Sequence, residues 1–222
     1  MLNLIIKDIV IQKKTLLYAF LYSVFAPIFF SSIKPSGIGL YVLCPIVTTY
    51  FFITYAANYD DKNKSEMVLN SLPLKRSDIV ISKYISIFVF VTIGIIYSTL
   101  IGCIGKTTGL AIFTGSISLL DIVLVLMGGC IFGAMFFPTY FKFGYVKTRI
   151  FNTILFMIIF FVPMNIINYV RSNPNNILVQ KFNYFINNTS SLTQDSLALI
   201  IGLICFMISL MISIRIYNNK EF

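Results

Sequence analysis

Few side chains in this sequence could take part in catalysis, and the sequence lacks residues that most classes of catalytic site require. Histidine is absent, which excludes His-based acid–base catalysis, the common nucleophile triads and most zinc sites. The cysteines lie in apolar stretches without metal-ligand spacing, so we interpret them as small packing residues: Cys44, Cys103, Cys130 and Cys205. We therefore expect no catalytic residue, metal site or cofactor on this chain.

The stretch Leu100–Thr107, LIGCIGKT, resembles a phosphate-binding loop only in its last three residues. That loop requires a glycine five positions before the glycine of its Gly-Lys-Thr, and Leu100 occupies this position. The stretch also ends a long apolar run, whereas a phosphate-binding loop follows a strand. It therefore predicts no ATP site on this chain.

Two carboxylates, Asp121 and Asp195, stand at the beginnings of apolar runs. There a carboxylate can accept hydrogen bonds from free N–H groups and complement the helix dipole. We interpret both as helix caps, with a substrate contact as the alternative role for Asp121. We place no other acid near an apolar run, so we expect no buried charge that could relay protons or sodium ions, which argues against a secondary transporter.

Charged side chains are concentrated in the segment Asp60–Tyr84, DDKNKSEMVLNSLPLKRSDIVISKY, between runs that carry none. Ser65 can cap a short helix, with Glu66 in its first turn, where the helix dipole favours an anion. Pro73 disfavours a helical residue before it and ends that helix. The pattern predicts a short amphipathic helix that a tight turn joins to the next long helix.

The composition indicates that membrane-spanning helices position these residues. Hydrophobic residues make up 58% of the 222, charged residues only 11%, and the mean hydropathy is +0.88, far above that of a soluble domain. Apolar runs of about 20 residues can cross the roughly 30 Å hydrocarbon layer as helices, and these runs lack the alternation of barrel strands. We predict an all-α polytopic membrane protein, a single transmembrane domain over 1–222, with six spans at about 15–33, 38–58, 80–105, 120–140, 150–170 and 196–216.

The positive charges predict how these spans are oriented. All but four of the 17 lysines and arginines lie in the segments that six spans place on one side: 1–14, 60–83, 142–149 and 215–222. Because cytoplasmic loops carry an excess of Lys and Arg, we expect both termini in the cytoplasm and the chain in the cell membrane, surrounded by lipids. This bias accounts for the net charge of +9 without a nucleic-acid partner.

Two further segments are amphipathic without being long enough or apolar enough to span. The first residues, MLNLIIKDIVIQKK, repeat apolar residues near helical spacing, which predicts an interfacial helix at the cytoplasmic surface, or else a longer first span. Apolar residues also repeat over 177–186 within the polar segment 171–194, which predicts an outer amphipathic helix before the last span. The alternative for this second segment is a helix that lies on the outer leaflet.

Small and amide side chains within the expected spans indicate contacts with protein. Gly129 and Gly133 have the spacing that lets helix backbones approach closely in lipid. Packing within the subunit is the simpler interpretation, and a dimer contact is the alternative. Asn152 and Asn165 place amides on the fifth span, where they should face protein or a water-lined path. We treat these two asparagines and Asp121 as candidate substrate-path residues.

The charged segment resembles a known signature. Its residues Glu66, Leu69, Leu72-Pro73, Arg76, Ile79-Val80 and Lys83 resemble the E–L–LP–R–IV–K pattern of type-2 ATP-binding-cassette (ABC) transporter permeases, and the layout of the whole chain is similar to theirs. The resemblance implies that this segment is a coupling helix that docks on a separate ATPase subunit. Glu66, Leu69, Leu72, Pro73 and Arg76 would then lie in the ATPase groove.

The same resemblance implies the permease subunit of an ABC exporter, with ATP bound by the ATPase partner and the path completed by a second permease subunit, identical or different. A path lined by Phe and Tyr would suit amphipathic or hydrophobic cargo such as peptide toxins or antimicrobial peptides, and hence a part in virulence or peptide resistance. The wealth of Ile, Lys, Asn, Phe and Tyr is typical of a low-GC Gram-positive bacterium.

Two alternatives remain open. The first is a standalone membrane immunity or sensor protein without an ATPase partner. The second is an intramembrane enzyme, which the absence of histidine and of buried acids disfavours.

Overall fold

The computed structural model describes residues 2–29, 39–108, 116–173, 176–177, 179–180, 188 and 190–220. Its long elements within these ranges are helices. The α-helices are α1 (Leu2–Val10), α2 (Lys13–Phe29), α3 (Cys44–Lys62), α4 (Ser65–Ser71), α5 (Arg76–Thr108), α6 (Leu119–Ser172) and α8 (Ser191–Asn218), and a π-helical turn, η1 (Gly39–Leu43), precedes α3. The all-α prediction is confirmed for the described part of the chain.

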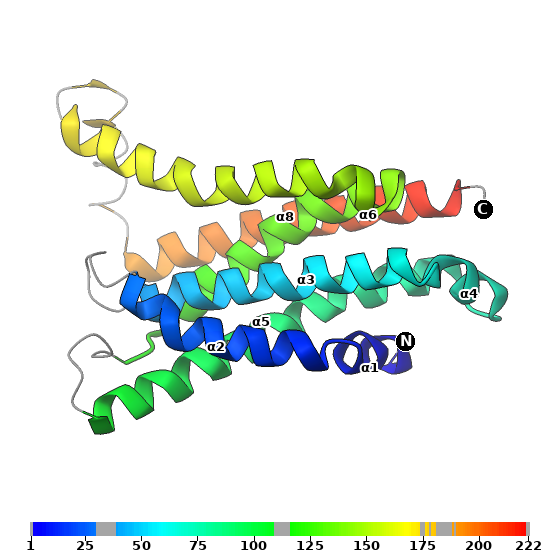
Figure 1. Ribbon diagram of the computed structural model, residues 1–222. Coiled ribbons are helices and arrows are strands. Elements are labelled where there is room, and N and C mark those ends of the chain that lie inside the picture. The colour runs from blue at the N-terminus through cyan, green and yellow to red at the C-terminus, as the bar shows by residue number, and fades with distance from the viewer. Residues whose placement is uncertain are drawn as a thin grey trace.

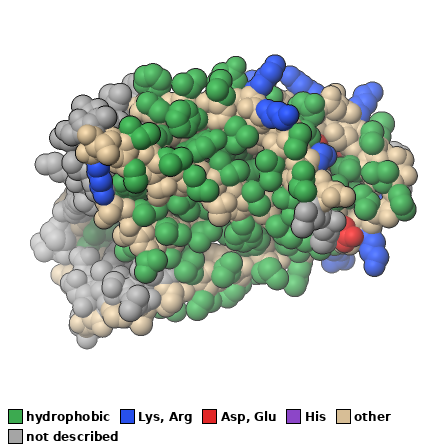
Figure 2. All heavy atoms as spheres, turned by 90° about the horizontal axis from the view of Figure 1, so that it is seen from below, with side chains coloured by type: hydrophobic (Ala, Val, Ile, Leu, Met, Phe, Trp, Pro, Cys, Tyr) green, Lys and Arg blue, Asp and Glu red, His purple; other side chains and the backbone are tan. Residues whose placement is uncertain are grey.

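The long helices lie side by side in a bundle, with α4 and both marked chain ends at the same end of it (Figure 1). We call this the charged end. Lys and Arg side chains gather there on the face that Figure 2 shows, whereas hydrophobic side chains cover most of the rest of that face. Such a surface suits a bilayer around the bundle and water or headgroups at the charged end.

Helix α6 consists of two arms that reverse direction at the charged end (Figure 1). Gly144 makes the reversal possible, because its φ of 76° and ψ of 171° lie in a region that is essentially restricted to glycine. Residues 119–143 form the first arm and residues 145–172 the second. The Tyr50 ring of α3 lies 5.2 Å from the Phe132 ring of the first arm and 4.3 Å from the Phe156 ring of the second.

The core is built around α3 and the charged-end half of α5. Phe52 and Phe90 pack at a ring distance of 5.5 Å, and both are buried. Aromatic rings of the first arm of α6 stack along its axis, from Phe132 through Phe136 to Tyr140. Helix α8 is fixed by polar contacts as well: the Tyr84 hydroxyl lies 2.7 Å from that of Ser209 and 2.8 Å from that of Ser213.

Four described helical stretches are long and apolar enough to cross a membrane: Gly39–Lys62, Arg76–Thr107, Leu119–Ile158 and Leu199–Asn218. The six-span prediction is therefore not confirmed. Helix α2 has 17 residues, somewhat fewer than the roughly 20 that a span needs. The expected fourth and fifth spans form the two arms of α6.

The face that α1 and α2 turn toward the bundle is polar. Its buried residues follow helical spacing: Leu4, Asp8, Gln12, Thr15, Ala19 and Ser23. Apolar side chains such as Ile6, Val10 and Leu17 are exposed. Helix α1 occupies the segment for which an interfacial helix was predicted, and its exposed apolar side chains lie away from the bundle while Asp8 enters the protein. The predicted outer helix over 177–186 lies almost wholly outside the described residues.

Candidate functional site

Helix α4 lies at the charged end of the bundle (Figure 1) and follows α3 and precedes α5 in the chain. Lys64, with φ 49° and ψ 37°, turns the chain into it, so that Ser65 is its first residue and not the side-chain cap that the sequence predicts. It ends where expected: Leu72 is extended, with φ −82° and ψ 153°, in front of Pro73. Helix α5 begins at Arg76, three residues after Pro73. The turn is short, so a displacement of α4 must move the start of α5.

One side of α4 is packed and the other is bare. Leu69 is buried against the core, with 8% of its surface exposed. Met67, Val68 and Leu72 are exposed at 63%, 60% and 47%. We call these three residues the exposed α4 face. Exposed apolar patches mark contacts with another protein or with a membrane, and this one lies at the charged end of the bundle (Figure 1).

Glu66 and Arg76 point back into this chain. The Glu66 carboxylate accepts a hydrogen bond of 2.7 Å from the Lys220 ammonium group. The Arg76 guanidinium donates to the backbone carbonyls of Asn218 and Lys220, at 2.9 and 3.0 Å. Of the residues expected in an ATPase groove, the structure therefore pairs these two with the end of α8, buries Leu69, and leaves Leu72 and Pro73 exposed.

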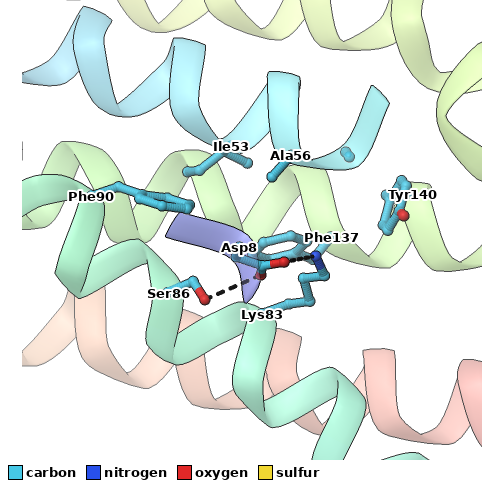
Figure 3. Close-up of a pocket in the computed structure, with 9 residues that line it drawn as sticks. Asp8, Ile53, Ala56, Lys83, Ser86, Phe90, Phe137 and Tyr140 are labelled. Atoms are coloured by element: carbon cyan, nitrogen blue, oxygen red, sulfur yellow. Dashed lines mark hydrogen bonds and ion pairs between the residues drawn. The ribbon is translucent and has the colours of Figure 1, made fainter. Parts of the chain in front are cut away.

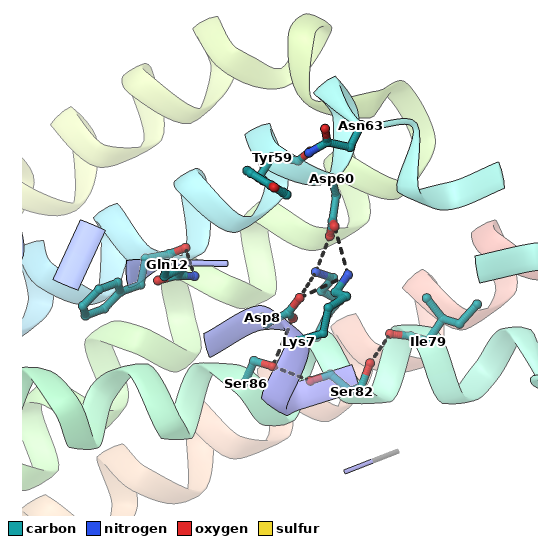
Figure 4. A network of polar contacts seen from close by, with 11 residues as sticks. Lys7, Asp8, Gln12, Tyr59, Asp60, Asn63, Ile79, Ser82 and Ser86 are labelled. Carbon is teal, nitrogen blue, oxygen red and sulfur yellow. Dashed lines mark hydrogen bonds and ion pairs between the residues drawn. The ribbon is translucent and has the colours of Figure 1, made fainter. Parts of the chain in front are cut away.

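A buried ionic cluster lies deeper in the bundle than the contacts of Glu66 and Arg76 (Figure 4). Lys83 of α5 bridges Asp8 of α1, at 2.8 Å, and Asp60 of α3. Lys7 completes it, 2.9 Å from Asp60 and 3.4 Å from Asp8. Asp8, Asp60 and Lys83 are only 1%, 3% and 7% exposed, and the two positive and two negative charges balance. We call these four residues the ionic cluster.

The ionic cluster corrects the expectation that no buried charge exists in this protein. Asp60 and Lys83 lie at the two ends of the segment 60–83, which was expected on the cytoplasmic side, but α3 continues to Lys62 and α5 already begins at Arg76. Both side chains are therefore carried inward on helices. One signal was available: Asp8 occupies the same helical stripe as Leu4, Gln12 and Thr15, all of which are buried.

Two cavities of about 10 Å³ flank Lys83, each large enough for one water molecule. Asp8, Ser86 and Phe137 line the first, which Figure 3 shows beside the Lys83 ammonium group. Asp60, Glu66 and Tyr217 line the second, and Tyr140 borders both. The second cavity thus separates the ionic cluster from the Glu66–Lys220 pair.

A larger groove of about 270 Å³ opens between α2, α3 and the second arm of α6. Tyr18, Tyr55 and Tyr145 line it together with Phe51 and the polar residues Thr15, Thr54 and Asn58. The Thr15 hydroxyl is buried and has no hydrogen-bond partner among the described residues. Aromatic rings with hydroxyl and amide groups can bind a ligand that is itself amphipathic.

The residues predicted to line a substrate path do not come together. Asp121 forms a capping box with Ser118, in which the Ser118 N–H donates to the Asp121 carboxylate at 2.8 Å. Asn165 is exposed and donates to the Phe161 carbonyl one turn earlier. Asn152 is buried, and its carbonyl oxygen has no partner in the described part of the chain. The side chain of Asp195 lies outside the described residues.

Gly129 and Gly133 face α5 of the same chain. A Cβ at Gly129 would lie 2.8 Å from Val91 Cγ2, and one at Gly133 would lie 2.2 Å from Ile87 Cδ1. Glycine at both positions therefore lets α5 and the first arm of α6 approach closely. Among the described residues no group of three or more Cys, Asp or Glu side chains is arranged to hold a metal ion.

The model of a family described as "ABC-2 family transporter protein" matches residues 3–218. No curated protein sequence and no solved structure matches the chain. The matched range covers the ionic cluster, α4 and the described helices of the bundle except Leu2, the first residue of α1.

Proposed function

The chain belongs to the ABC-2 family of transporter proteins and is a multi-pass permease subunit, and we propose that it serves an exporter whose ATPase subunit docks on the exposed α4 face. A second permease subunit, identical or related, would complete the transport path. ATP would be bound and hydrolysed on the ATPase subunits. The proposal places the charged end, with both termini, in the cytoplasm of a Gram-positive cell.

The position and surface of α4 carry this proposal. Its exposed apolar residues, Met67, Val68 and Leu72, lie at the charged end, where a soluble partner can reach them. The turn through Pro73 and the extended Leu72 join it to α5, a helix of 33 residues that runs through the bundle. Movement of a bound ATPase would therefore reach the membrane-spanning region through α5.

We propose that the groove between α2, α3 and the second arm of α6 receives the cargo. Its tyrosines and its unpaired Thr15 hydroxyl favour an amphipathic molecule over a purely aliphatic one. In length and layout the chain is also similar to permease subunits of the staphylococcal exporter of phenol-soluble modulins, which are amphipathic toxin peptides. Amphipathic peptides are accordingly the cargo class that we propose.

The test begins with the purified permease in nanodiscs and a candidate ABC ATPase subunit from the same genome. We expect the ATPase to bind the wild-type permease, and the double change Met67→Asp with Val68→Asp to weaken binding at least tenfold. Placing two carboxylates in a desolvated apolar contact costs on the order of a few kcal/mol. Binding is measured by surface-immobilised titration, and ATP hydrolysis in parallel.

Leu119→Asp provides the matched control, because Leu119 is 82% exposed and opens the first arm of α6, away from the charged end. This variant should bind the ATPase as the wild type does. Equal affinity of the wild-type and the Met67→Asp, Val68→Asp permease would contradict docking on α4. Transport that proceeds without any ATPase subunit would instead support a standalone membrane protein.

A further inference from the structure

The end of α8 and the residues directly after it form hydrogen bonds with both α4 and the start of α5. Four hydrogen bonds make this contact: Lys220 to Glu66 at 2.7 Å, Asn70 to the Tyr217 hydroxyl at 3.2 Å, and Arg76 to the carbonyls of Asn218 and Lys220. We call this set of residues the α4–α8 clasp. The contacts join residues that are 142 to 154 positions apart in sequence, and they hold the inward-facing side of α4 to the end of α8.

The contacts of Arg76 and Glu66 also stabilise helix ends. The last carbonyls of a helix lack partners within it, and a cation near them also complements the helix dipole. Arg76 meets this need for α8 by donating to the carbonyl of Asn218, its last residue, and it also donates to the carbonyl of Lys220 two residues later. Glu66 lies in the first turn of α4, where its negative charge is favourable, and is only 28% exposed in its ion pair.

The apolar floor beneath these contacts fixes their geometry. Tyr217 is fully buried, its ring lies 5.2 Å from that of Phe141, and its hydroxyl accepts the Asn70 amide. Leu69 is buried on the same side of α4. The residues of α4 that turn inward are therefore Glu66, Leu69 and Asn70, and those that turn outward are Met67, Val68 and Ser71.

We propose that Glu66, Arg76 and Lys220 are positioning residues, which lock α4 to α8 so that the exposed α4 face meets the ATPase in a fixed orientation. This inference rests on the proposed docking of an ATPase on α4. It assigns Glu66 and Arg76 a task within the chain, while Met67, Val68 and Leu72 make the contact with the partner. Motion of α4 then moves α8 together with α5.

A charge exchange tests the lock. Lys220→Glu and Glu66→Lys each place like charges together, and the double variant restores an ion pair with the signs reversed. We expect each single change to raise hydrogen–deuterium exchange of the amides in 65–76 and to lower cargo transport per ATP hydrolysed by about threefold, as for a partly exposed ion pair. The double variant should recover both values.

Lys147→Glu is the control for the change in charge. Lys147 is exposed near the reversal of α6, and the described residues give it no ion pair. It should leave amide exchange in 65–76 and the coupling ratio at wild-type values. Unchanged exchange in Lys220→Glu would overturn the lock, and so would a double variant that remains as impaired as the singles.

The two proposals fail in different ways. A wild-type permease that binds no ATPase subunit contradicts the proposed function, while the exchange measurement still decides whether the clasp holds α4. An ATPase that binds the wild type and loses affinity additively with Glu66→Lys and Lys220→Glu contradicts the positioning role alone. That result would place Glu66 in direct contact with the partner.

Discussion

Lys83 holds two carboxylates in the interior of the bundle that would otherwise repel each other. Its ammonium group bridges Asp8 of α1 and Asp60 of α3, and all three side chains are nearly inaccessible to solvent. Since one partner of a buried ion pair cannot be removed without stranding the other, the residue matters for folding more than its own pairing energy suggests.

We expect Lys83→Met to lower the free energy of unfolding by about 3–5 kcal/mol, because it leaves Asp8 and Asp60 with Lys7 as their remaining cation. Thermal unfolding in detergent, followed with a thiol-reactive dye, measures the effect in a background with the exposed Cys103 and Cys205 changed to serine, since Cys44 and Cys130 are buried in the folded protein. Lys106→Met is the control, because Lys106 is exposed in the last turn of the same helix. Equal melting temperatures for both variants would show that the ionic cluster does not hold the bundle together.

At the scale of elements, the reversal of α6 depends on one residue. Gly144 has φ 76° and ψ 171°, which residues with a side chain rarely adopt. Gly144→Ala should therefore cost about 1–3 kcal/mol of stability, although a Cβ there would meet Asp61 Oδ1 only at an ordinary 3.5 Å. The same thermal unfolding assay detects this loss.

Gly202→Ala is the matched control for that substitution. Gly202 is helical within α8, and its Cβ would lie at an ordinary contact distance of 3.5 Å from Met127 Cε. Alanine should stabilise the helix there by up to about 1 kcal/mol. If both substitutions shift the melting temperature alike, backbone strain at Gly144 does not govern the reversal.

The elements were predictable where a local rule decides them, and the contacts between them were not. Apolar length placed α3, α5 and α8, and Pro73 placed the end of α4. Asp121 was interpreted as a helix cap from its place at the start of an apolar run, and it forms a capping box with Ser118. The ionic cluster and the α4–α8 clasp could not be predicted, because they join residues such as Asp8 and Lys83 or Glu66 and Lys220, whose proximity only the packed bundle creates.

At the scale of the whole molecule, the two ends of the bundle differ in charge and should face different compartments. The charged end collects α4, the reversal of α6 and the end of α8 (Figure 1). Few positive residues belong to the side that was expected to lie opposite. Lys106, in the last turn of α5, is one of them. Because lysine and arginine are retained in the cytoplasm, the charged end should be cytoplasmic.

Cysteine labelling measures this orientation in a background without the four native cysteines. An impermeant maleimide added to whole cells should label Lys106→Cys, whereas Lys147→Cys and Asn219→Cys should react only after the cells are opened. All three positions are exposed. Labelling of Lys106→Cys and Lys147→Cys from the same side would contradict both the orientation and a full crossing between them.

Site-specific photo-crosslinking from α4 in the assembled transporter measures directly whether an ATPase subunit docks on the exposed α4 face. A benzophenone amino acid at Met67 should form a covalent adduct with the ATPase subunit, because Met67 projects from the exposed α4 face at 63% exposure. The same probe at Leu119 should form none. Efficient crosslinking from Leu119, or an ATPase that is captured from neither position, would contradict the account in which α4 receives work from a separate protein.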